Sequence, residues 1–478
     1  MKYYNNLLRN LSGKIKYIFM GVLLVAISPG CKKFVTVGNP PNVLTSDKVF
    51  ATDNSATSAV LSIYIDMMND QFGSNGSFVC FTMSSLGGMS ANELQWTQNN
   101  TTTIPYQEFS SHGLTPPNTY VGALWLDGYK YIYRTNAILD GIAKSTGMTA
   151  AGKKLVEGEA KFIRGFCYFY LVNLFGDVPL VLSPDYVTNM SLPRTPASQV
   201  WAQILQDLKD AKQLLPVAYP TAERLRPNSA TAGALLARSY LYLGKWPEAE
   251  AESDAIISSG VYGATLPALN QVFLKQSTET IWQLQPVRAN TNTLEGGSFL
   301  VTTATLPNFQ ITQYLLSAFE PNDNRKTTWI GFSSPVANPS WAFPAKYKAG
   351  TSANITEYYI VFRLTEQYLI RSEARAHQGG SKLATGISDL NVVRSRAGLP
   401  AANPADQNAL YLALEHERQV EFFAEWGHRW LDLKRTNRAQ AVLQPLSPTN
   451  SWKTGSELYP IPGAEIGGNP FLVQNPGY

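Results

Sequence analysis

The chain has 478 residues, a formal net charge of +4 and 44% hydrophobic residues, enough to form a large core in one or two domains. The whole positive excess lies in the first thirty residues, where four basic residues have no acidic counterpart. The rest of the chain is neutral and lacks the clustered positive charge that binding to a phosphate backbone requires. We therefore expect no nucleic-acid partner.

Residues 1–30 have the layout of a secretory signal peptide: basic residues, then an apolar run, then the small residues Ser-Pro-Gly before Cys31. The apolar run over 17–27 has 11 residues, fewer than the roughly 20 that a helix needs to cross a bilayer. A cysteine directly after a small residue resembles the lipobox of bacterial lipoproteins, although Ser-Pro-Gly departs from the usual Leu-small-small pattern. We expect cleavage before Cys31 and its lipidation. The alternative is an ordinary cleaved signal in which Cys31 has no role.

Residues 31–45 contain Asn-Pro-Pro-Asn, which favours extended backbone with little to bury. This segment is expected to be a tether between the lipid and a single domain over 46–478. Beyond Cys31, the chain has only Cys80 and Cys167. Cys167 lies within an aromatic helical pattern where a small buried thiol is typical, so we expect no disulfide, no metal site and no cofactor.

Helical periodicity recurs along the chain from this point. Apolar residues at 60, 63, 64 and 67 mark one face of an amphipathic helix. A second helix is expected around 125–136 and a third over 159–175, the latter ended by Gly176.

Residues 231–259 predict a helix hairpin. An Ala/Leu-rich helix ends at Gly244, and Pro247 opens a second helix, the positions at which Gly and Pro are favoured. Small alanine residues on both helices allow the close approach seen in tetratricopeptide hairpins. A similar hairpin is expected over 364–396, broken at Gly379-Gly380. The fold class is therefore mostly α, a single helical scaffold with tetratricopeptide-like hairpins and long loop-rich insertions.

The segments 70–120 and 262–357 are rich in Gly, Ser, Thr, Asn and Pro and show little helical period. We expect loops or short strands there, and loops this long inside a compact protein are usually functional. They also carry several tryptophan and tyrosine residues.

Familiar catalytic motifs are missing from the sequence: there is no Gly-x-Ser-x-Gly elbow, Walker loop or Gly-x-Gly-x-x-Gly turn. His416-Glu417 begins like a zinc-protease motif, but Val420 replaces the second histidine. Glu417, Glu421 and Glu425 recur every four residues and could supply an acid and a base for glycoside cleavage. Because arginines are interleaved with them, and Glu425 precedes Arg429 by the spacing of a helical ion pair, we interpret the row as a structural ion network.

The segment from Glu415 to Arg435 resembles the C-terminal signature of the SusD/RagB family of outer-membrane nutrient-binding lipoproteins. Its matching elements are Glu417-Arg418, Glu421-Phe422, Glu425, Gly427, Arg429-Trp430 and Asp432-Leu433-Lys434-Arg435. Further similar blocks are Gly176-Asp177-Val178-Pro179, Asp323 with Arg325, Arg363 with Glu366, Arg396-Ala397-Gly398-Leu399-Pro400 and Tyr459-Pro460-Ile461-Pro462. These blocks cover nearly the whole chain after Cys31 in the expected order.

The resemblance implies a helical scaffold that packs on a SusC-like TonB-dependent barrel transporter, with loop-rich insertions that hold glycan. It implies attachment to the outer membrane through lipid and exposure at the cell surface. Acidic residues often follow the lipidated cysteine in surface-exported relatives, whereas Lys32 and Lys33 do so here.

A sugar offers an apolar face and a rim of hydroxyl groups, so its site needs aromatic rings with amide or charged groups beside them. Trp96 is the first candidate and Trp341 the second, because each lies in one of the two loop-rich segments. The full set of candidate ligand-binding residues is Trp96, Asn99, Asn100, Arg288, Asn290 and Trp341. The competing interpretation is that each ring packs beneath its own loop. Trp125, Trp246, Trp426 and Trp430 lie on helical patterns, and we expect them to be core residues.

The sequence thus favours a non-catalytic protein that binds an oligosaccharide or polysaccharide and delivers it to a partner transporter. One alternative keeps the scaffold but makes the ligand a peptide, held through backbone hydrogen bonds. A more remote alternative is a glycoside hydrolase that uses the Glu417 row.

Overall fold

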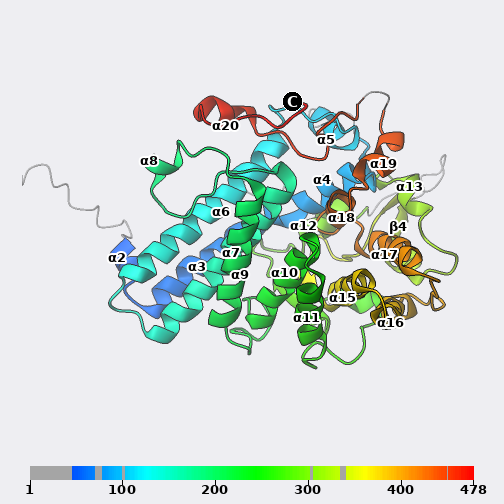
Figure 1. Ribbon diagram of the computed structural model, residues 1–478, viewed down its shortest axis with the longest axis horizontal. Coiled ribbons are helices and arrows are strands. Elements are labelled where there is room, and N and C mark those ends of the chain that lie inside the picture. Colours follow the sequence, from blue (N-terminus) through cyan, green and yellow to red (C-terminus); the bar gives the residue numbers. More distant parts are fainter. Residues whose placement is uncertain (1–45, 70–77, 99–102, 302–304, 334–340, 449–450) are drawn as a thin grey trace, which may run out of the picture. The chain divides into compact units, whose positions relative to one another are not determined.

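The computed structural model describes residues 46–69, 78–98, 103–301, 305–333, 341–448 and 451–478 (Figure 1). The signal segment, Cys31 and the tether lie outside these residues. The described chain begins with the short helix α2 (Ser46–Val49), and Val49–Tyr478 forms one compact unit. Most of it is helical, as the sequence predicts. No helix among the described residues is both long enough and apolar enough to cross a membrane.

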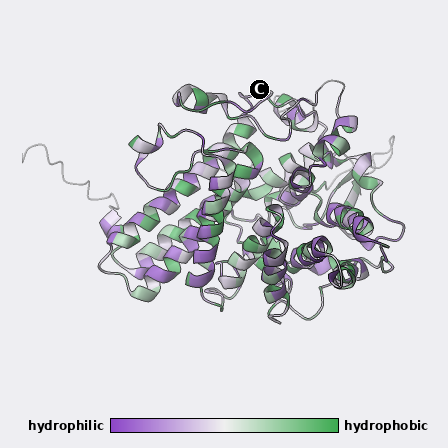
Figure 2. Cartoon of the chain, in the orientation of Figure 1, coloured by the Kyte–Doolittle hydropathy of each residue, from purple (hydrophilic) through white to green (hydrophobic). Residues whose placement is uncertain are grey.

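Long helices form the N-terminal part of the unit, around α7. They are α3 (Asp53–Met68), α6 (Thr119–Lys144), α7 (Ala150–Phe175) and α9 (Ala197–Leu214). The side chains of Thr52, Asn118 and Thr149 accept backbone N–H groups at the starts of α3, α6 and α7, which satisfies donors that a helix leaves free. Figure 2 shows hydrophilic and hydrophobic residues alternating along these helices, the pattern of a helix with one buried face.

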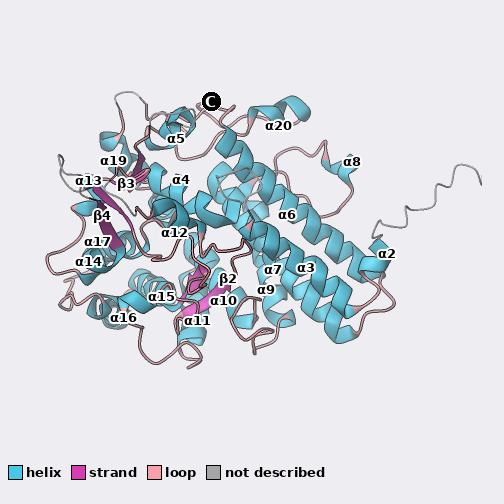
Figure 3. Ribbon diagram, turned by 180° about the vertical axis from the view of Figure 1, so that it is seen from behind, coloured by secondary structure: helices cyan, strands magenta, loops and turns pink. Residues whose placement is uncertain are grey.

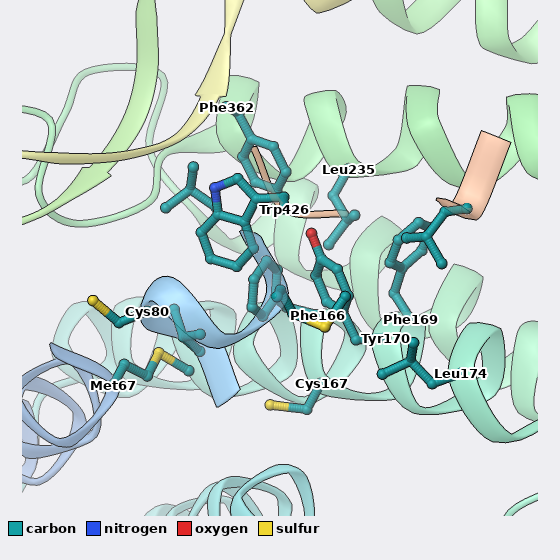
Figure 4. Packing of buried hydrophobic residues seen from close by; sticks show 14 of the residues in the cluster. Met67, Cys80, Phe166, Cys167, Phe169, Tyr170, Leu174, Leu235, Phe362 and Trp426 are labelled. Carbon is teal, nitrogen blue, oxygen red and sulfur yellow. The ribbon is translucent and has the colours of Figure 1, made fainter. Parts of the chain in front are cut away.

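The core forms where α7 meets the rest of the unit. Phe166 and Tyr170 point toward Phe362 and Trp426 (Figure 4), with ring centroids 6.3 Å apart for Phe166 and Phe362 and 5.7 Å for Tyr170 and Trp426. Cys167 is fully buried on the same helix, as its aromatic pattern predicts. Residues about two hundred or more positions apart in the sequence therefore share one core.

Both predicted helix hairpins are confirmed. The first consists of α10 (Ser229–Tyr242) and α11 (Trp246–Ile257), and the second of α15 (Leu364–Gln378) and α16 (Lys382–Arg396). Helices α17 (Gln407–Phe422) and α18 (His428–Arg435) follow the second hairpin in the chain. Gly244 ends the first hairpin's leading helix at φ 67° and Gly379 ends the second's at φ 66°, a backbone conformation that glycine adopts at little cost. Helix α11 packs against α15, so the two hairpins lie side by side although they are far apart in sequence.

Short strands join distant parts of the chain. The strands are β1 (Leu94–Trp96), β2 (Thr280–Leu284), β3 (Phe309–Ile311), β4 (Ile330–Ser333), β5 (Trp341–Pro344) and β6 (Tyr359–Arg363). They pair antiparallel as β1 with β3, β2 with β6 and β4 with β5. All five residues of β2 and of β6 are buried, so this pair is part of the core.

The two segments expected to be loops or short strands also contain helices, which corrects that prediction. The additional elements of the unit are η3 (Phe78–Thr82), α4 (Met83–Ser90), α5 (Thr103–Ser110), α8 (Tyr186–Asn189), η4 (Leu269–Gln271), α12 (Leu294–Phe299), α13 (Gln313–Leu316), α14 (Asn324–Trp329), α19 (Ala439–Leu443), η5 (Gln444–Leu446) and α20 (Gly463–Gly468). Every residue of α4 is buried. A helix buried on all sides has no polar face, and therefore no periodicity to detect in the sequence.

Candidate ligand-binding site

Four strands from the two loop-rich segments form a group that we call the strand cluster, made of β1, β3, β4 and β5. Trp96 ends β1 and lies opposite Phe309 of β3, while Trp341 begins β5 opposite Ser333 of β4. Strand β3 packs against β5 and joins the two pairs. Figure 3 shows β3 and β4 near α13 and α17. The fold therefore places both candidate tryptophans in one group of strands.

The indole ring of Trp96 is half-buried and held by other rings. Its centroid lies 4.5 Å from that of Tyr106 and 5.0 Å from that of Phe309, and Tyr106 in turn stacks on Tyr120 at 4.4 Å. The Trp96 Nε1 donor has no hydrogen-bond partner among the described residues. A ring fixed in this way keeps its orientation before a ligand arrives, so little side-chain entropy is lost on binding.

Amide side chains lie on β1 and β3 and just after β1. The Gln95 Nε2 group donates to Gln310 Oε1 across β1 and β3 at 2.8 Å, and the Gln95 side chain is exposed. The Gln98 amide donates to Thr97 Oγ1 at 3.2 Å. Because successive side chains of a strand point to opposite faces, Gln95 and Gln310 lie on the face of the β1–β3 pair opposite to the Trp96 and Phe309 rings. Gln310 was not foreseen, because only strand pairing brings it beside β1.

The other candidate residues are distributed differently. Asn99 and Asn100 lie outside the described residues. Arg288 and Asn290 lie in the loop between β2 and α12, where the Asn290 carbonyl accepts the backbone N–H of Ser352 at 2.7 Å. The strand cluster, as defined, includes neither residue.

Several aromatic residues of the loop-rich segments belong to the core. Trp282 and Trp329 are fully buried and donate to the Leu225 carbonyl at 3.1 Å and the Leu269 carbonyl at 3.0 Å. Of the tryptophans predicted to be core residues, Trp125, Trp426 and Trp430 are buried. Trp246 is half-buried at the start of α11.

The Glu417 row forms a buried ion network, as interpreted from the sequence. Arg325 donates to Glu417 at 2.6 Å and to Glu421 at 3.0 Å. Arg363 donates to Glu421 at 2.6 Å and to Glu425 at 2.9 Å. These carboxylates are therefore engaged by guanidinium groups and do not face an open cleft.

The electrostatics of the row agree with this structural role. Burial alone would raise the pKa of Glu421, but the guanidinium groups of Arg396 and Arg363 hold it well below its usual value. Burial raises the pKa of Glu417, and the nearby Arg325 opposes that rise. Glycoside cleavage needs one carboxyl group as acid and another as base or nucleophile at the sugar, whereas both of these bind arginine.

The structure corrects one prediction about this segment and shows how His416 is bound. The prediction of a helical ion pair between Glu425 and Arg429 is wrong. Helix α17 ends at Phe422, so the spacing is not helical; Glu425 binds Lys346 at 2.5 Å, and Arg429 binds Glu415 instead at 3.2 Å. His416 is a structural residue whose Nε2 lies 2.6 Å from the Ala318 carbonyl oxygen. No group of potential metal ligands gathers among the described residues.

Known proteins match almost the whole chain. A model of the SusD-like family described as "Starch-binding associating with outer membrane" matches residues 46–241, and the model of the SusD family matches residues 315–478. Two proteins of Formosa agariphila, SusD-like protein P2 and SusD-like protein P25, are each 24% identical to this chain. The alignments cover 97% of this chain, with 100% of the first relative and 98% of the second.

Solved structures share the fold. A SusD superfamily protein from Bacteroides vulgatus superposes with a TM-score of 0.78 at 22% identity, covering 89% of this chain and 99% of the other. A protein described as a laminarin-binding SusD-like protein superposes with a TM-score of 0.73 at 24% identity, with the same coverage. Both family models, the full-length relatives and the shared fold agree, and we conclude that this chain belongs to the SusD/RagB family.

Proposed function

We propose that this protein is a non-catalytic glycan-binding subunit, anchored by lipid on Cys31 at the outer membrane, that delivers its ligand to a TonB-dependent barrel transporter. The observation that carries the glycan assignment is the half-buried ring of Trp96, which Tyr106 and Phe309 hold in a fixed orientation. Affinity would come from stacking and hydrogen bonds rather than from charge, in line with the neutral chain after residue 30. One structural neighbour is described as laminarin-binding, which makes laminarin a first ligand to test.

Trp341, on β5 of the strand cluster, is proposed as a second sugar-stacking ring. Asn99, Asn100, Arg288 and Asn290 stay as candidate polar partners. The non-catalytic assignment is supported by the pairing of the Glu417 row with arginine.

Affinity electrophoresis tests the glycan assignment directly. Residues 32–478 should be retarded in gels containing laminarin, starch or another member of a polysaccharide panel. Trp96→Ala should weaken retardation about tenfold or more, because it removes the stacking surface. Trp201→Ala is a matched control, since it truncates a half-buried tryptophan on α9, and it should leave retardation unchanged.

The outcomes separate this proposal from its alternatives. If no polysaccharide in the panel retards the protein, the glycan assignment fails. Binding of an oligopeptide that is insensitive to Trp96→Ala would favour a peptide ligand held by backbone hydrogen bonds. Release of shorter sugars from a bound glycan, abolished by Glu421→Gln, would indicate a hydrolase.

Membrane attachment is tested with Cys31→Ala in the producing bacterium. The wild-type protein should sediment with the outer membrane and gain the mass of the lipid. The variant should lose both properties, and protease added to intact cells should degrade the wild-type protein if it faces outward. Copurification of a barrel transporter after mild detergent extraction tests the partner assignment.

A further inference from the structure

A pocket of about 370 Å³ lies between α6, α8 and α20. Figure 1 shows these three helices near one another at the upper left, whereas β4 of the strand cluster lies at the right. The segment between α7 and α8 and the chain that follows α20 complete the wall. A pocket of this size suits a small molecule or part of a larger one. The proposed glycan function does not use it.

Aromatic side chains form much of this wall. Trp125, Tyr129 and Tyr133 follow one another at four-residue intervals on α6 and therefore share one face of that helix. Tyr186 adds a ring from α8. Trp125 is buried beneath Tyr129, with ring centroids 4.9 Å apart, but Tyr133 is 48% exposed and Tyr186 is 66% exposed. A ligand can therefore reach the faces of two rings, and such faces attract cations.

The charge of the pocket is negative. Of the described residues that line it, only Glu465 on α20 is charged. Glu465 is half-buried, and its carboxylate has neither a hydrogen-bond donor nor a salt-bridge partner in the described part of the chain. Burial raises the pKa of the Tyr129 hydroxyl well above its usual value, and the nearby Tyr168 and the Glu465 carboxylate add to this rise. Glu465 thus lies close to the aromatic wall.

Arg194 is a nearby cation, but it does not neutralise Glu465. It opposes the rise in the pKa of Tyr129. Its guanidinium donates to the carbonyl oxygens of Asp177 at 2.7 Å and Val473 at 2.9 Å, and among the described residues it forms no salt bridge with Glu465. The Glu465 carboxylate is therefore available to a cation that enters the pocket.

The other polar groups of the wall are mostly engaged within the protein. The Asn189 and Asn469 amides each donate to a backbone carbonyl oxygen at 2.9 Å, and the Tyr129 hydroxyl donates to another at 2.8 Å. Few donors remain for an anion or for the hydroxyl rim of a sugar. The ligand that this wall suits has an apolar body and a positive charge.

We propose that this pocket binds a small organic cation, a primary or quaternary ammonium group on an apolar body. The ammonium group pairs with the Glu465 carboxylate and lies against the faces of Tyr133 and Tyr186. The apolar body contacts Leu126 and Met190, two exposed side chains that also line the pocket. The site is independent of the strand cluster and of any bound glycan.

Isothermal titration calorimetry on residues 32–478 at pH 7 and low salt tests the proposal with two cations and two neutral analogues. Choline is compared with 3,3-dimethylbutan-1-ol, its uncharged isostere, and pentylammonium with pentan-1-ol. At least one cation should bind saturably and at least tenfold more tightly than its analogue, because only the cation gains from the rings and the carboxylate. Which cation binds tells a quaternary from a primary ammonium ligand. If neither cation binds, or if each analogue binds as tightly as its cation, the proposal is overturned.

Variants locate the site. Glu465→Gln removes the charge and keeps the shape, and should lower the affinity for the cation about tenfold or more. Tyr186→Leu removes an exposed ring but keeps apolar bulk, and should lower it about threefold. Glu248→Gln is the matched control, since it removes an exposed carboxylate from α11; neither it nor Trp96→Ala should change the affinity.

Retardation by polysaccharide should be the same in Glu465→Gln as in wild type, which separates this site from the proposed glycan site. Circular dichroism of each variant checks that it is folded. Wild-type affinity for the cation in a folded Glu465→Gln protein would place the site elsewhere and contradict the proposal.

Discussion

Glu93, which follows α4, is a carboxyl group held in the core. It is 1% exposed, Oε2 accepts the Ala424 N–H at 3.4 Å, and Oε1 has no hydrogen-bond partner among the described residues. Burial raises the pKa of Glu93 to about 8, although the charge of Arg429 acts in the opposite direction. The folded protein therefore holds Glu93 protonated at pH values where the unfolded chain has already lost that proton.

Because the pKa of Glu93 is raised, we predict that Glu93→Gln stabilises the protein relative to wild type by an amount that grows with pH. The contribution of Glu93 to stability is fully present below its unfolded pKa and is lost as the pH rises toward 8. The glutamine variant lacks this titration, so relative to wild type it should gain at least about 1 kcal/mol between pH 5 and pH 8. Thermal unfolding of both proteins across this range measures the difference. Parallel stability curves would show that Glu93 does not titrate in this way.

Arg325 is the buried cation that holds the Glu417 row to the rest of the unit. Its side chain is fully buried and also donates to Asp323 Oδ2 at 2.9 Å. Arg325→Met leaves buried carboxylates without their partner and should lower the free energy of unfolding by about 3–5 kcal/mol.

Arg438→Met provides the matched control for Arg325→Met in urea unfolding. Arg438 is 43% exposed and pairs with Glu415, so its loss should cost about 0–1 kcal/mol. Equal costs for the two substitutions would contradict a structural role for the buried network.

At the scale of elements, α4 and α18 approach each other through glycine. A Cβ atom added at Gly87 would lie 2.5 Å from the Gly427 Cα atom, closer than any real contact of that kind. Gly427 itself precedes α18 at φ 67°. The two backbones can be this close only because neither residue has a side chain.

Gly87→Ala should therefore destabilise the protein by about 1–3 kcal/mol through overpacking. Gly122→Ala on α6 is the control, because a Cβ atom there meets nothing within 4 Å and alanine favours a helix by about 0.5–1 kcal/mol. In chemical denaturation, the unfolding midpoint of Gly87→Ala should fall to a lower denaturant concentration. The midpoint of Gly122→Ala should rise or stay the same. A neutral Gly87→Ala would show that the helices can move apart at little cost.

Elements differ in how far the sequence predicts them. Turn signals at Gly244 and Gly379 located both hairpins, because a positive-φ glycine at a helix end is a local feature. The eight residues of α4 gave no such signal, since all of them are buried. The predicted ion pair between Glu425 and Arg429 does not form for a related reason. Helix α17 ends at Phe422, and the backbone of Ala424, at φ 51°, is no longer helical.

At the scale of the whole molecule, contacts between distant segments bind the unit together. Arg238 on α10 donates to both oxygens of Glu366 on α15, at 2.6 and 2.7 Å, with both side chains buried. Strand β2 pairs with β6, and the ring centroids of Trp282 on β2 and Tyr64 on α3 lie 6.0 Å apart. The segments matched by the two family models therefore share one core.

Because of this shared core, residues 46–478 should unfold in one cooperative transition in differential scanning calorimetry. The fragment 46–241, produced alone, should lack a cooperative transition and a near-ultraviolet circular dichroism signal, since α7 and α10 would expose core residues. Two separate calorimetric transitions, or a native-like fragment, would indicate independent folding units.

The sequence by itself determined the class of the fold, the main helices, both hairpins and the family resemblance, because periodicity, caps and turn residues act over a few neighbouring positions. It also singled out Trp96. Only the tertiary structure decided that Trp282 and Trp329 are core while Trp96 stays half-exposed opposite Phe309. Strand pairs and buried ion pairs join residues tens to hundreds of positions apart, and no local pattern specifies which distant partner a side chain will meet.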